Sequence, residues 1–495
     1  MKRRAWAVTA LLAGFLGACT LGPNFREPDA PRVPAANPYT PEPMAAQTAS
    51  APGPGGAAQR FVPGDDIPAQ WWSLFHSEPL DRLIRSALCN SPTLASAQAA
   101  LRQAQESYRA EAGSLLFPAV SGLGSATRER GSFGTSEPSV FNLYNASVNV
   151  SYNVDAFGAT RRDLEAVWAT VDYQRFQLEA AYLALTANVV TSAIQEASLR
   201  AQLQTTSEVL ALQEKSLAVI EKQAALGAVA RPAVLAQRTQ VAQTRATLPA
   251  LEKALAQTHH QLAVYAGRFP SEPGLPEFQL ESLQLPQELP LSLPSSLVRQ
   301  RPDIRANEAL WHEASARIGV ATASLFPQLN LSGSLGFQAF EIGNLLSSSA
   351  RIWSIGAALS IPIFNGGALQ ARRRGAIAAY EQAGEQYRAT VLAAFQNVAD
   401  VLRALDTDAA ALRAQADAEA AARESLELVS RQYEVGASSY LALLDAQRTH
   451  QQSRLSLVQA EAARYADTAA LFQALGGGWW NRADLDGKAD RAAQN

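Results

Sequence analysis

The sequence has little cysteine and little net charge. Its 495 residues include only two cysteines, Cys19 and Cys89, and the formal net charge is −3. With Cys19 in a signal-peptide context, only Cys89 remains in the body of the chain, which excludes an intramolecular disulfide framework. A slightly acidic balance does not suit the phosphate backbone of a nucleic acid. The composition therefore predicts no nucleic-acid partner.

Long apolar runs and metal-ligand spacings are also missing. Beyond the amino terminus there is no uninterrupted run of about 18 apolar residues, the length that a membrane-spanning helix needs. Any crossing of a membrane must then use strands. No pair of cysteines or histidines has the spacing of a metal site, and no acid, base and nucleophile pattern is visible. The sequence predicts no metal, no other resident cofactor and no enzymatic activity.

The amino terminus has the pattern of a secretory signal. Lys2, Arg3 and Arg4 precede an apolar run that ends in Leu16-Gly17-Ala18-Cys19, a charged start followed by a short apolar segment and small residues. The ending resembles a bacterial lipobox, which implies removal of residues 1–18 and acylation of Cys19. The alternative is an ordinary signal with an incidental cysteine. Thr20, rather than an aspartate, is what lipoproteins of the outer membrane tend to carry.

Three segments are predicted to lack long regular elements. Residues 19–68 are rich in proline, alanine and glycine and predict an extended tether that follows the acylated cysteine. Residues 268–300 form a proline-rich linker, and residues 477–495 form a polar tail. Cys89 lies at a predicted helix end, and we expect a small buried thiol there.

Between these segments the sequence repeats itself. Leu116-Phe117-Pro118 recurs as Leu325-Phe326-Pro327, and Gln237-Arg238-Thr239 recurs as Gln447-Arg448-Thr449. The first repeat covers residues 69–267 and the second covers residues 301–476. Each repeat predicts a short helix, a β-hairpin, a long helix, a glycine turn and a medium helix, and the first is preceded by a further equatorial helix.

The predicted hairpins cover about 119–156 and about 328–363. From Leu143 to Asp155 apolar and polar residues alternate with a period of two, and the second hairpin alternates in the same way. One apolar and one polar face suits a strand between lipid and water. The same pattern suits a half-buried sheet on a soluble core. Four strands are too few to close a membrane barrel, so membrane hairpins require several chains to share one barrel.

The long helices are predicted at about 159–226 and about 367–435, where no proline occurs and good helix formers dominate. The medium helices follow at about 233–266 and about 441–475. Arg161 and Arg162 lie at the start of the first long helix, where they suggest either a solvated face or contacts with lipid phosphates. The elements together predict an α+β membrane protein with long helical hairpins and four strands per protomer.

The chain closely resembles the TolC-type outer-membrane efflux proteins. The resemblance rests on the order of the elements and on specific motifs: Trp71-Trp72, Asn90-Ser91-Pro92, Arg301-Pro302-Asp303-Ile304, Phe364-Asn365-Gly366-Gly367 and Leu444-Asp445-Ala446-Gln447-Arg448. The match is narrower to the lipoprotein (NodT-type) branch, which provides the outer-membrane factors of tripartite RND pumps. It implies a homotrimer whose twelve strands close one β-barrel, continuous with a periplasmic α-barrel.

The resemblance also implies a gate at the periplasmic tip. Tyr433 matches a tyrosine that holds the closed tip, and Asp445 matches a carboxylate that forms a ring in the pore. The turns at Gly227 and Gly436 match the tips at which an adaptor docks. A solvated helix residue is the alternative for Asp445. Ala442 and Ala233 stand where some relatives have acidic residues, so the resemblance does not predict which contacts close the tip in this chain.

The implied partners are sister subunits, a periplasmic adaptor (membrane fusion) protein, an inner-membrane RND transporter and the lipid of the bacterial outer membrane. The implied function is a passive exit duct for drugs or other small toxic compounds. Two alternatives stay open: the outer-membrane component of a protein secretion system, and a periplasmic coiled-coil scaffold lipoprotein without a channel. Single-channel conductance in a planar bilayer would distinguish either duct from the scaffold, which has no channel.

Overall fold

The computed structural model describes every residue except 1–19, 30, 32–38, 132–137 and 483–495. The chain divides into two compact units. The first contains Met1–Pro28, Ala99–Arg175 and Ala306–Ala389, and the second contains Asp29–Gln98, Phe176–Arg305 and Thr390–Asn495. No helix in the described part of the chain has an apolar stretch long enough to cross a membrane.

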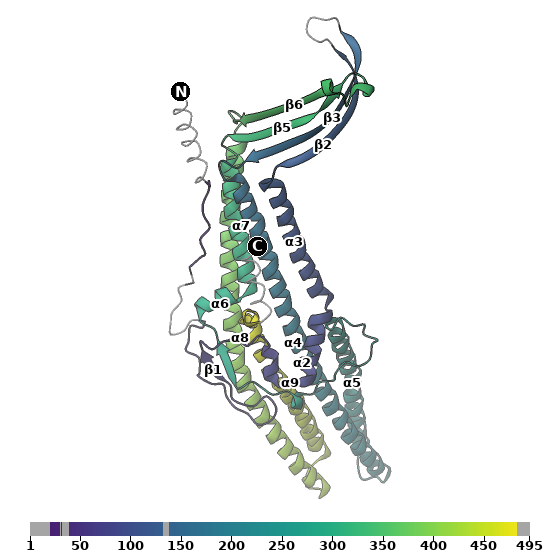
Figure 1. Cartoon of the computed structure of the whole chain (residues 1–495). Helices are drawn as coiled ribbons and strands as arrows, with labels where there is room; N and C mark the ends of the chain where they lie inside the picture. Colours follow the sequence, from purple (N-terminus) through teal and green to yellow (C-terminus); the bar gives the residue numbers. More distant parts are fainter. Residues whose placement is uncertain (1–19, 30, 32–38, 132–137, 483–495) are drawn as a thin grey trace. The chain divides into compact units, whose positions relative to one another are not determined.

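The helices follow the order that the internal repeat predicts (Figure 1). They are α2 (Glu78–Asn90), α3 (Pro92–Leu116), α4 (Ala159–Ala225), α5 (Arg231–Tyr265), α6 (Pro294–Gln300), α7 (Pro302–Ala323), α8 (Ala368–Glu434) and α9 (Tyr440–Ala474). The long helices α4 and α8 each contain 67 residues. Asp155 caps the start of α4, because its carboxylate accepts hydrogen bonds from the amides of Thr160 and Arg161.

The first unit contains an antiparallel sheet in the order β2-β3-β5-β6 (Figure 1). Its strands are β2 (Ala119–Gly131), β3 (Ser139–Val154), β5 (Gln328–Ala339) and β6 (Arg351–Ser360). Each repeat supplies one hairpin, and β3 pairs with β5 to join them. The sheet therefore places the two repeats side by side.

The register sorts the side chains into one polar and one apolar face. Ser121, Asn149, Ser334 and Ser354 form one row across the four strands, and the hydroxyls of Ser334 and Ser354 are 2.8 Å apart. The neighbouring row is mainly apolar and contains Val148, Leu335 and Trp353. Adjacent rows point to opposite faces, because side chains alternate along a strand.

The apolar face is not covered by the described part of the chain. Val148, Leu335, Trp353 and Ile355 are all exposed, and every residue of β6 is exposed. A half-buried sheet on a soluble core would bury this face, so that alternative is wrong for the protomer. The outer edges of β2 and β6 also have no strand partner within the described residues. Such edges need a partner before they can lie in hydrocarbon.

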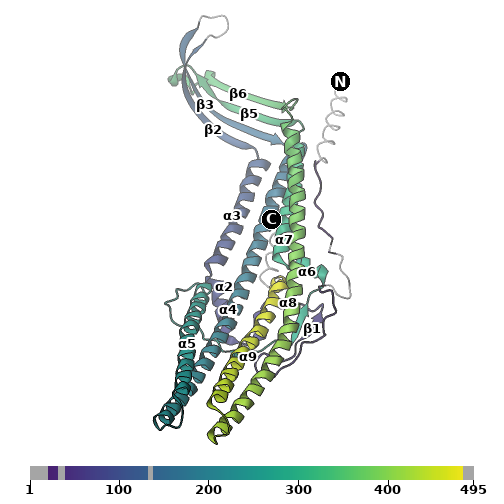
Figure 2. The ribbon, with the colours of Figure 1, turned by 180° about the vertical axis from the view of Figure 1, so that it is seen from behind.

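The second unit has its own hydrophobic core. Trp71 lies on a short 3-10 helix, Trp71–Phe75, and stacks on Phe472 of α9 with ring centroids 5.3 Å apart. The core continues through Ile84 of α2 and Val190 of α4, which are fully buried. Within this unit α5 lies beside the distal part of α4, and α9 lies beside the distal part of α8 (Figure 2).

The proline-rich segments pack on this core. Strand β1 (Arg60–Pro63) pairs in parallel with β4 (Glu288–Leu291) of the linker. The buried amide of Gln59 donates to the carbonyl of Pro286 and to the hydroxyl of Thr468, both at 2.9 Å. The segment between the amino terminus and α2 therefore has specific contacts, which its lack of periodicity did not indicate.

Glu461 of α9 lies under this segment and is only 8% exposed. A Cβ atom at Gly53 would lie 3.1 Å from its Oε1, so the backbone of the covering chain packs directly on the carboxyl. Burial raises the pKa of Glu461 to about 7, and the charge of Glu281 adds to the shift. The carboxyl is therefore protonated in the folded protein at mildly acidic pH.

This raised pKa predicts a pH-dependent stability. Below about pH 4 both the folded and the unfolded state hold the proton, whereas between about pH 4.3 and 7 only the folded state does. The free energy of unfolding therefore falls by about 4 kcal/mol as the pH rises through this window. Glu461→Gln should flatten part of this fall in thermal melts between pH 5 and 8. Glu252→Gln, an exposed position on α5, is the control. The prediction would be contradicted if the melting temperature of Glu461→Gln fell with pH as steeply as that of the wild type.

Two side-chain expectations are wrong. Cys89 is exposed, because it lies on the outward side of the last turn of α2 while Ala87 faces the core. Arg162 is neither solvated nor free for lipid phosphates: it is buried against the amino-terminal segment. Arg161 is exposed, as a solvated face predicts, and pairs with Asp155.

Candidate functional site at the helical tips

The two helical hairpins of the second unit end in the same kind of turn. At the first tip the amide of Gly227 donates to the carbonyl of Ala224, and the amide of Ala228 donates to the carbonyl of Gln223. Gly436 at the second tip makes the equivalent pair of bonds. This pair of hydrogen bonds is the Schellman motif, in which a helix ends at a residue with positive φ.

The glycines are required by backbone conformation and not by crowding. Gly227 has φ 76° and Gly436 has φ 77°, and a Cβ atom at either position would meet nothing within 4 Å. Other residues adopt this conformation at a cost of about 1–2 kcal/mol. The next helix then begins at once: Pro232 lies in the first turn of α5, and Ser439 caps α9 through the amide of Ala442.

Above the turns, side chains from both repeats form an apolar cluster, which we call the tip cluster. Its buried members are Ile220 of α4, Val234 of α5, and Tyr440, Leu443 and Leu444 of α9. Ala233 packs against it, where some relatives are expected to carry an acidic residue. The cluster therefore joins the two helical hairpins of one protomer.

A chain of hydrogen bonds accompanies the tip cluster, and we call it the tip network. The Tyr440 hydroxyl donates to Gln237 Oε1 at 2.5 Å, and Gln237 Nε2 donates to the carbonyl of Gln213 at 2.8 Å. The side chain of Gln213 in turn donates to Gln451 at 3.2 Å. Gln237 is fully buried. Burial also raises the pKa of Tyr440 far above its ordinary value, with Tyr433 contributing, so its hydroxyl remains a donor.

The predicted gate residues occupy different environments. Tyr433 is half-buried on α8, its hydroxyl donates to Gln223 of α4 at 3.2 Å, and its ring lies 5.9 Å from that of Tyr440. Asp445 is exposed on α9, and no side chain among the described residues is paired with it. The structure thus packs Tyr433 against the tip cluster and leaves Asp445 outside it.

The interpretation of the sequence missed Tyr440, Gln237, Gln213 and Gln451 as members of this site. A signal was present, because Gln237 belongs to the repeated Gln-Arg-Thr motif and lies at helical spacing among apolar positions. A glutamine at such a position predicts a buried amide that needs partners. Its partners could not be read from the sequence, because Tyr440 is 203 residues away.

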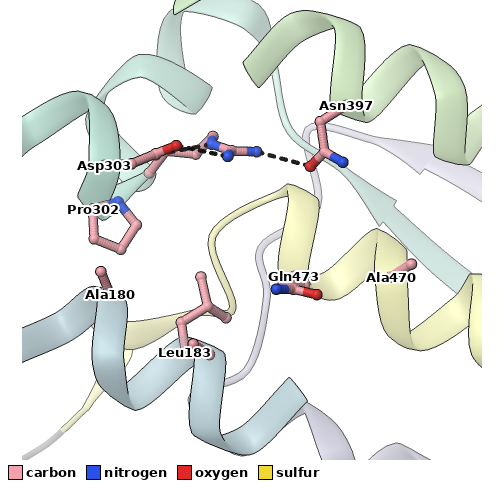
Figure 3. A pocket seen from close by; sticks show the side chains of 9 residues that line it. Ala180, Leu183, Pro302, Asp303, Asn397, Ala470 and Gln473 are labelled. Carbon is pink, nitrogen blue, oxygen red and sulfur yellow. Dashed lines mark hydrogen bonds and ion pairs between the residues drawn. The ribbon is translucent and has the colours of Figure 1, made fainter. Parts of the chain in front are cut away.

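The Arg301-Pro302-Asp303 motif has a structural position. Arg301 donates to both carboxylate oxygens of Asp303, to Asn397 of α8 and to the carbonyl of Ala474 at the end of α9. Arg301, Asp303 and Asn397 border a cavity of about 240 Å³, into which Gln473 also points (Figure 3). The motif therefore ties the start of α7 to α8 and α9.

Two further predictions concern a lipid and metals. Cys19 lies outside the described residues, so its predicted acylation stays a prediction. Among the residues that the structure describes, no group of three or more histidine, cysteine, aspartate or glutamate side chains is arranged to hold a metal ion.

The sequence matches the profile of the family described as outer membrane efflux protein twice, over residues 83–268 and 293–477. The two matches coincide with the two repeats, and the internal duplication is thereby confirmed. Together they cover most of the chain.

Similar proteins carry related descriptions. The chain is 31% identical to the probable efflux pump outer membrane protein TtgC of Pseudomonas putida, over 96% of this chain and 95% of that protein. It is 29% identical to the outer membrane protein OprJ of Pseudomonas aeruginosa, over 97% of both. It is 30% identical to the cation efflux system protein CusC of Escherichia coli, over 83% of this chain and 88% of that protein.

Solved structures agree with these sequence matches. The outer-membrane channel OprN superposes with a TM-score of 0.83 at 29% identity, covering 93% of this chain and all of OprN. The open MtrE outer membrane channel of Neisseria gonorrhoeae gives 0.78 at 26% identity, covering 93% of this chain and 99% of MtrE. The predicted TolC-like fold is confirmed. The chain belongs to the outer membrane efflux protein family and is an outer-membrane channel of an efflux system.

Proposed function

We propose that this chain is the acylated, homotrimeric exit duct of a tripartite RND-type efflux system. In this proposal four strands from each of three protomers close one twelve-stranded barrel in the outer membrane, and the helices continue it into the periplasm. Cys19 carries a covalent lipid, and no other cofactor is bound. The duct is a passive conduit without catalytic activity, and the energy for transport comes from the inner-membrane transporter.

The observation that carries this proposal is the sheet of the first unit. Among the described residues nothing covers its apolar face or pairs with its two edges, at β2 and β6, and its other face is polar. A single chain cannot satisfy these edges in a membrane. Pairing β6 of one protomer with β2 of the next satisfies all of them at once and leaves polar rows facing the lumen.

The helical tips support the proposed partners, and the descriptions of the relatives support the proposed cargo. We propose that the exposed turns at Gly227 and Gly436 are the docking points of a periplasmic adaptor, because Leu226 and Val435 beside them expose most of their apolar surface. TtgC and CusC are named for an efflux pump and for cation efflux. We propose drugs or other small toxic compounds as the cargo of this chain.

The experiment is reconstitution of the purified full-length protein in planar bilayers, together with electrophoresis of unheated samples. A trimer band and a single-channel conductance are expected. Complementation of a strain that lacks the channel should restore drug resistance only when an adaptor and a transporter are also present. Monomers that give no current would contradict the duct and favour the scaffold.

The same bilayers test Asp445. We expect Asp445→Ala to lower cation selectivity by a factor of about two to ten, because three carboxylates around a threefold axis attract cations. The measurement is the reversal potential in a salt gradient. Glu252→Ala, which removes an exposed carboxylate from α5, is the matched control. A reversal potential equal to that of the wild type would remove Asp445 from the pore ring.

A further inference from the structure

A buried arginine of the first unit holds the chain that directly follows the predicted acylation site. Arg162, at the start of α4, is only 3% exposed. Its guanidinium donates to the carbonyls of Leu21 at 3.2 Å and Gly22 at 3.4 Å, and to Asn24 Oδ1 at 2.6 Å. Glu165 lies 2.7 Å away and balances the charge. Three acceptors from one short segment make this a specific contact.

The segment lies in a recess that two glycines leave open. A Cβ atom at Gly158 would be 2.8 Å from Cα of Thr20, and a Cβ atom at Gly319 would be 2.8 Å from the carbonyl oxygen of Leu21. Such distances are closer than side chains tolerate, so both positions require glycine while the segment is in place. The amide of Leu21 also donates to the carbonyl of Phe157 at 3.2 Å.

An aromatic contact closes the far end of the segment. The ring of Phe25 stacks on His312 of α7 with centroids 4.6 Å apart, and it meets the edge of Trp311 at 5.8 Å. His312 is held in turn by Glu165, which lies 2.9 Å from its Nε2. The contacts therefore extend over Thr20–Phe25, and we call Gly158, Arg162, His312 and Gly319 the docking site.

We propose that the docking site positions the lipid anchor by holding Thr20, which directly follows the predicted acylation site, beside Gly158, where strand β3 ends and helix α4 begins. This inference rests on the proposed acylation of Cys19. Consecutive Cα atoms are about 3.8 Å apart, so a docked Thr20 leaves almost no free chain before the lipid.

The surroundings of Gly158 suit an acyl chain. The ring of Phe157 lies 5.1 Å from that of Phe326, and Phe326 is partly exposed. Aromatic side chains at the level where helix meets membrane strand are typical of the interface between headgroups and hydrocarbon. A lipid attached at this level enters the bilayer directly. The docking site thus fixes where the anchor enters the membrane relative to the sheet.

The experiment compares two glycine substitutions in helices of the same unit. Gly319→Ala places a Cβ against Leu21 and Arg162, whereas Gly113→Ala of α3 meets nothing within 4 Å. Alanine favours helix over glycine in both positions, so neither helix is weakened. Arg162→Ala is the second disrupting variant. Each full-length protein is expressed with a fatty acid that carries a photoreactive diazirine near its carboxyl end.

Two measurements are made on each variant. Hydrogen exchange should show the Leu21 amide at least tenfold less protected in Gly319→Ala and Arg162→Ala than in the wild type and Gly113→Ala. After illumination, peptide mapping should find crosslinks concentrated around Phe157 and Phe326 in the wild type and at least fivefold fewer in the two disrupting variants. Equal protection, or an equal spread of crosslinks in all four proteins, would overturn the inference.

Intact mass separates this inference from the acylation itself. A mature wild-type protein without added lipid mass would refute the proposed lipid on Cys19, while the exchange data would still report whether Thr20–Phe25 is docked. A lipidated protein whose crosslinks do not depend on Gly319 or Arg162 would keep the acylation and refute the positioning role.

Discussion

Replacing Gln237 by alanine is expected to raise the resting current of the channel about tenfold. The buried amide of Gln237 bonds the Tyr440 hydroxyl on one side and the Gln213 carbonyl on the other. Removing this amide leaves the Tyr440 hydroxyl and the Gln213 carbonyl buried without a hydrogen-bond partner, which destabilises the folded tip by about 2–4 kcal/mol. If about 1.4 kcal/mol of this destabilisation affects the closed state and not the open state, the population of open channels grows by about a factor of ten.

Single-channel recordings at low voltage measure this effect. Tyr440→Phe removes only the hydroxyl and keeps the ring in the tip cluster, so we expect a smaller increase in the same direction. Gln261→Ala is the matched control, because Gln261 is an exposed glutamine of the same helix that bonds only Tyr265 within α5. Wild-type currents in both Gln237→Ala and Tyr440→Phe would show that the tip network does not hold the closed state.

Arg464→Met is expected to cause the largest loss of stability in the second unit, about 3–5 kcal/mol. Arg464 is 1% exposed and donates to the Leu405 carbonyl at 2.9 Å and to the Thr48 hydroxyl at 3.1 Å. It also attracts the carboxylates of Asp467 and Asp408. Methionine keeps most of the volume but removes the cation, which leaves these acidic groups uncompensated.

The pH dependence of this loss identifies its cause. Burial, followed by the proximity of Asp408, raises the pKa of Asp467, and the charge of Arg464 opposes the shift. Without Arg464 the carboxyl of Asp467 titrates still higher. Its protonated form is neutral, so the variant should lose less stability at pH 5 than at pH 8. At pH 8 the Asp467 carboxyl is ionised in the unfolded state. In the folded variant it must either keep its proton or carry an uncompensated charge, and both cost free energy, so the loss of stability is larger at pH 8.

Thermal melts of the detergent-solubilised protein at pH 5 and pH 8 provide the measurement. Arg448→Met is the control, since Arg448 is exposed on the same helix. A deficit of equal size at both pH values would mean that lost packing, and not the uncompensated carboxylates, explains the destabilisation. No deficit at all would show that Arg464 is dispensable for the core.

Much of the fold follows from local patterns. The absence of proline over two long stretches, the period-two alternation of the hairpins and the glycines after α4 and α8 act over a few residues, where the physical rules are strong. The long helices and the strands therefore lie close to where the sequence places them. The amino-terminal segment lacks such patterns, and its contacts with Pro286, made through Gln59, and with Arg162 were not foreseen.

The candidate site was predicted only in part. The turns at Gly227 and Gly436 were predicted because turn chemistry is visible in the sequence, while the docking role of these turns and the gate role of Tyr433 stay predictions. The tip network was not, because two of its three bonds join the two repeats and the third joins α5 to α4. A glutamine that is buried and one that is solvated look alike until the neighbouring helix is in place.

The helices, the strands, the duplication and the family follow from residue spacing along the chain alone. Which faces and side chains meet depends on the tertiary structure. Within the described residues it pairs β3 with β5 and leaves the apolar face and the edges of β2 and β6 uncovered. It also brought Arg162 to a segment about 140 residues earlier and Tyr440 to Gln237. Such contacts depend on how distant segments pack in space, which spacing along the chain does not encode.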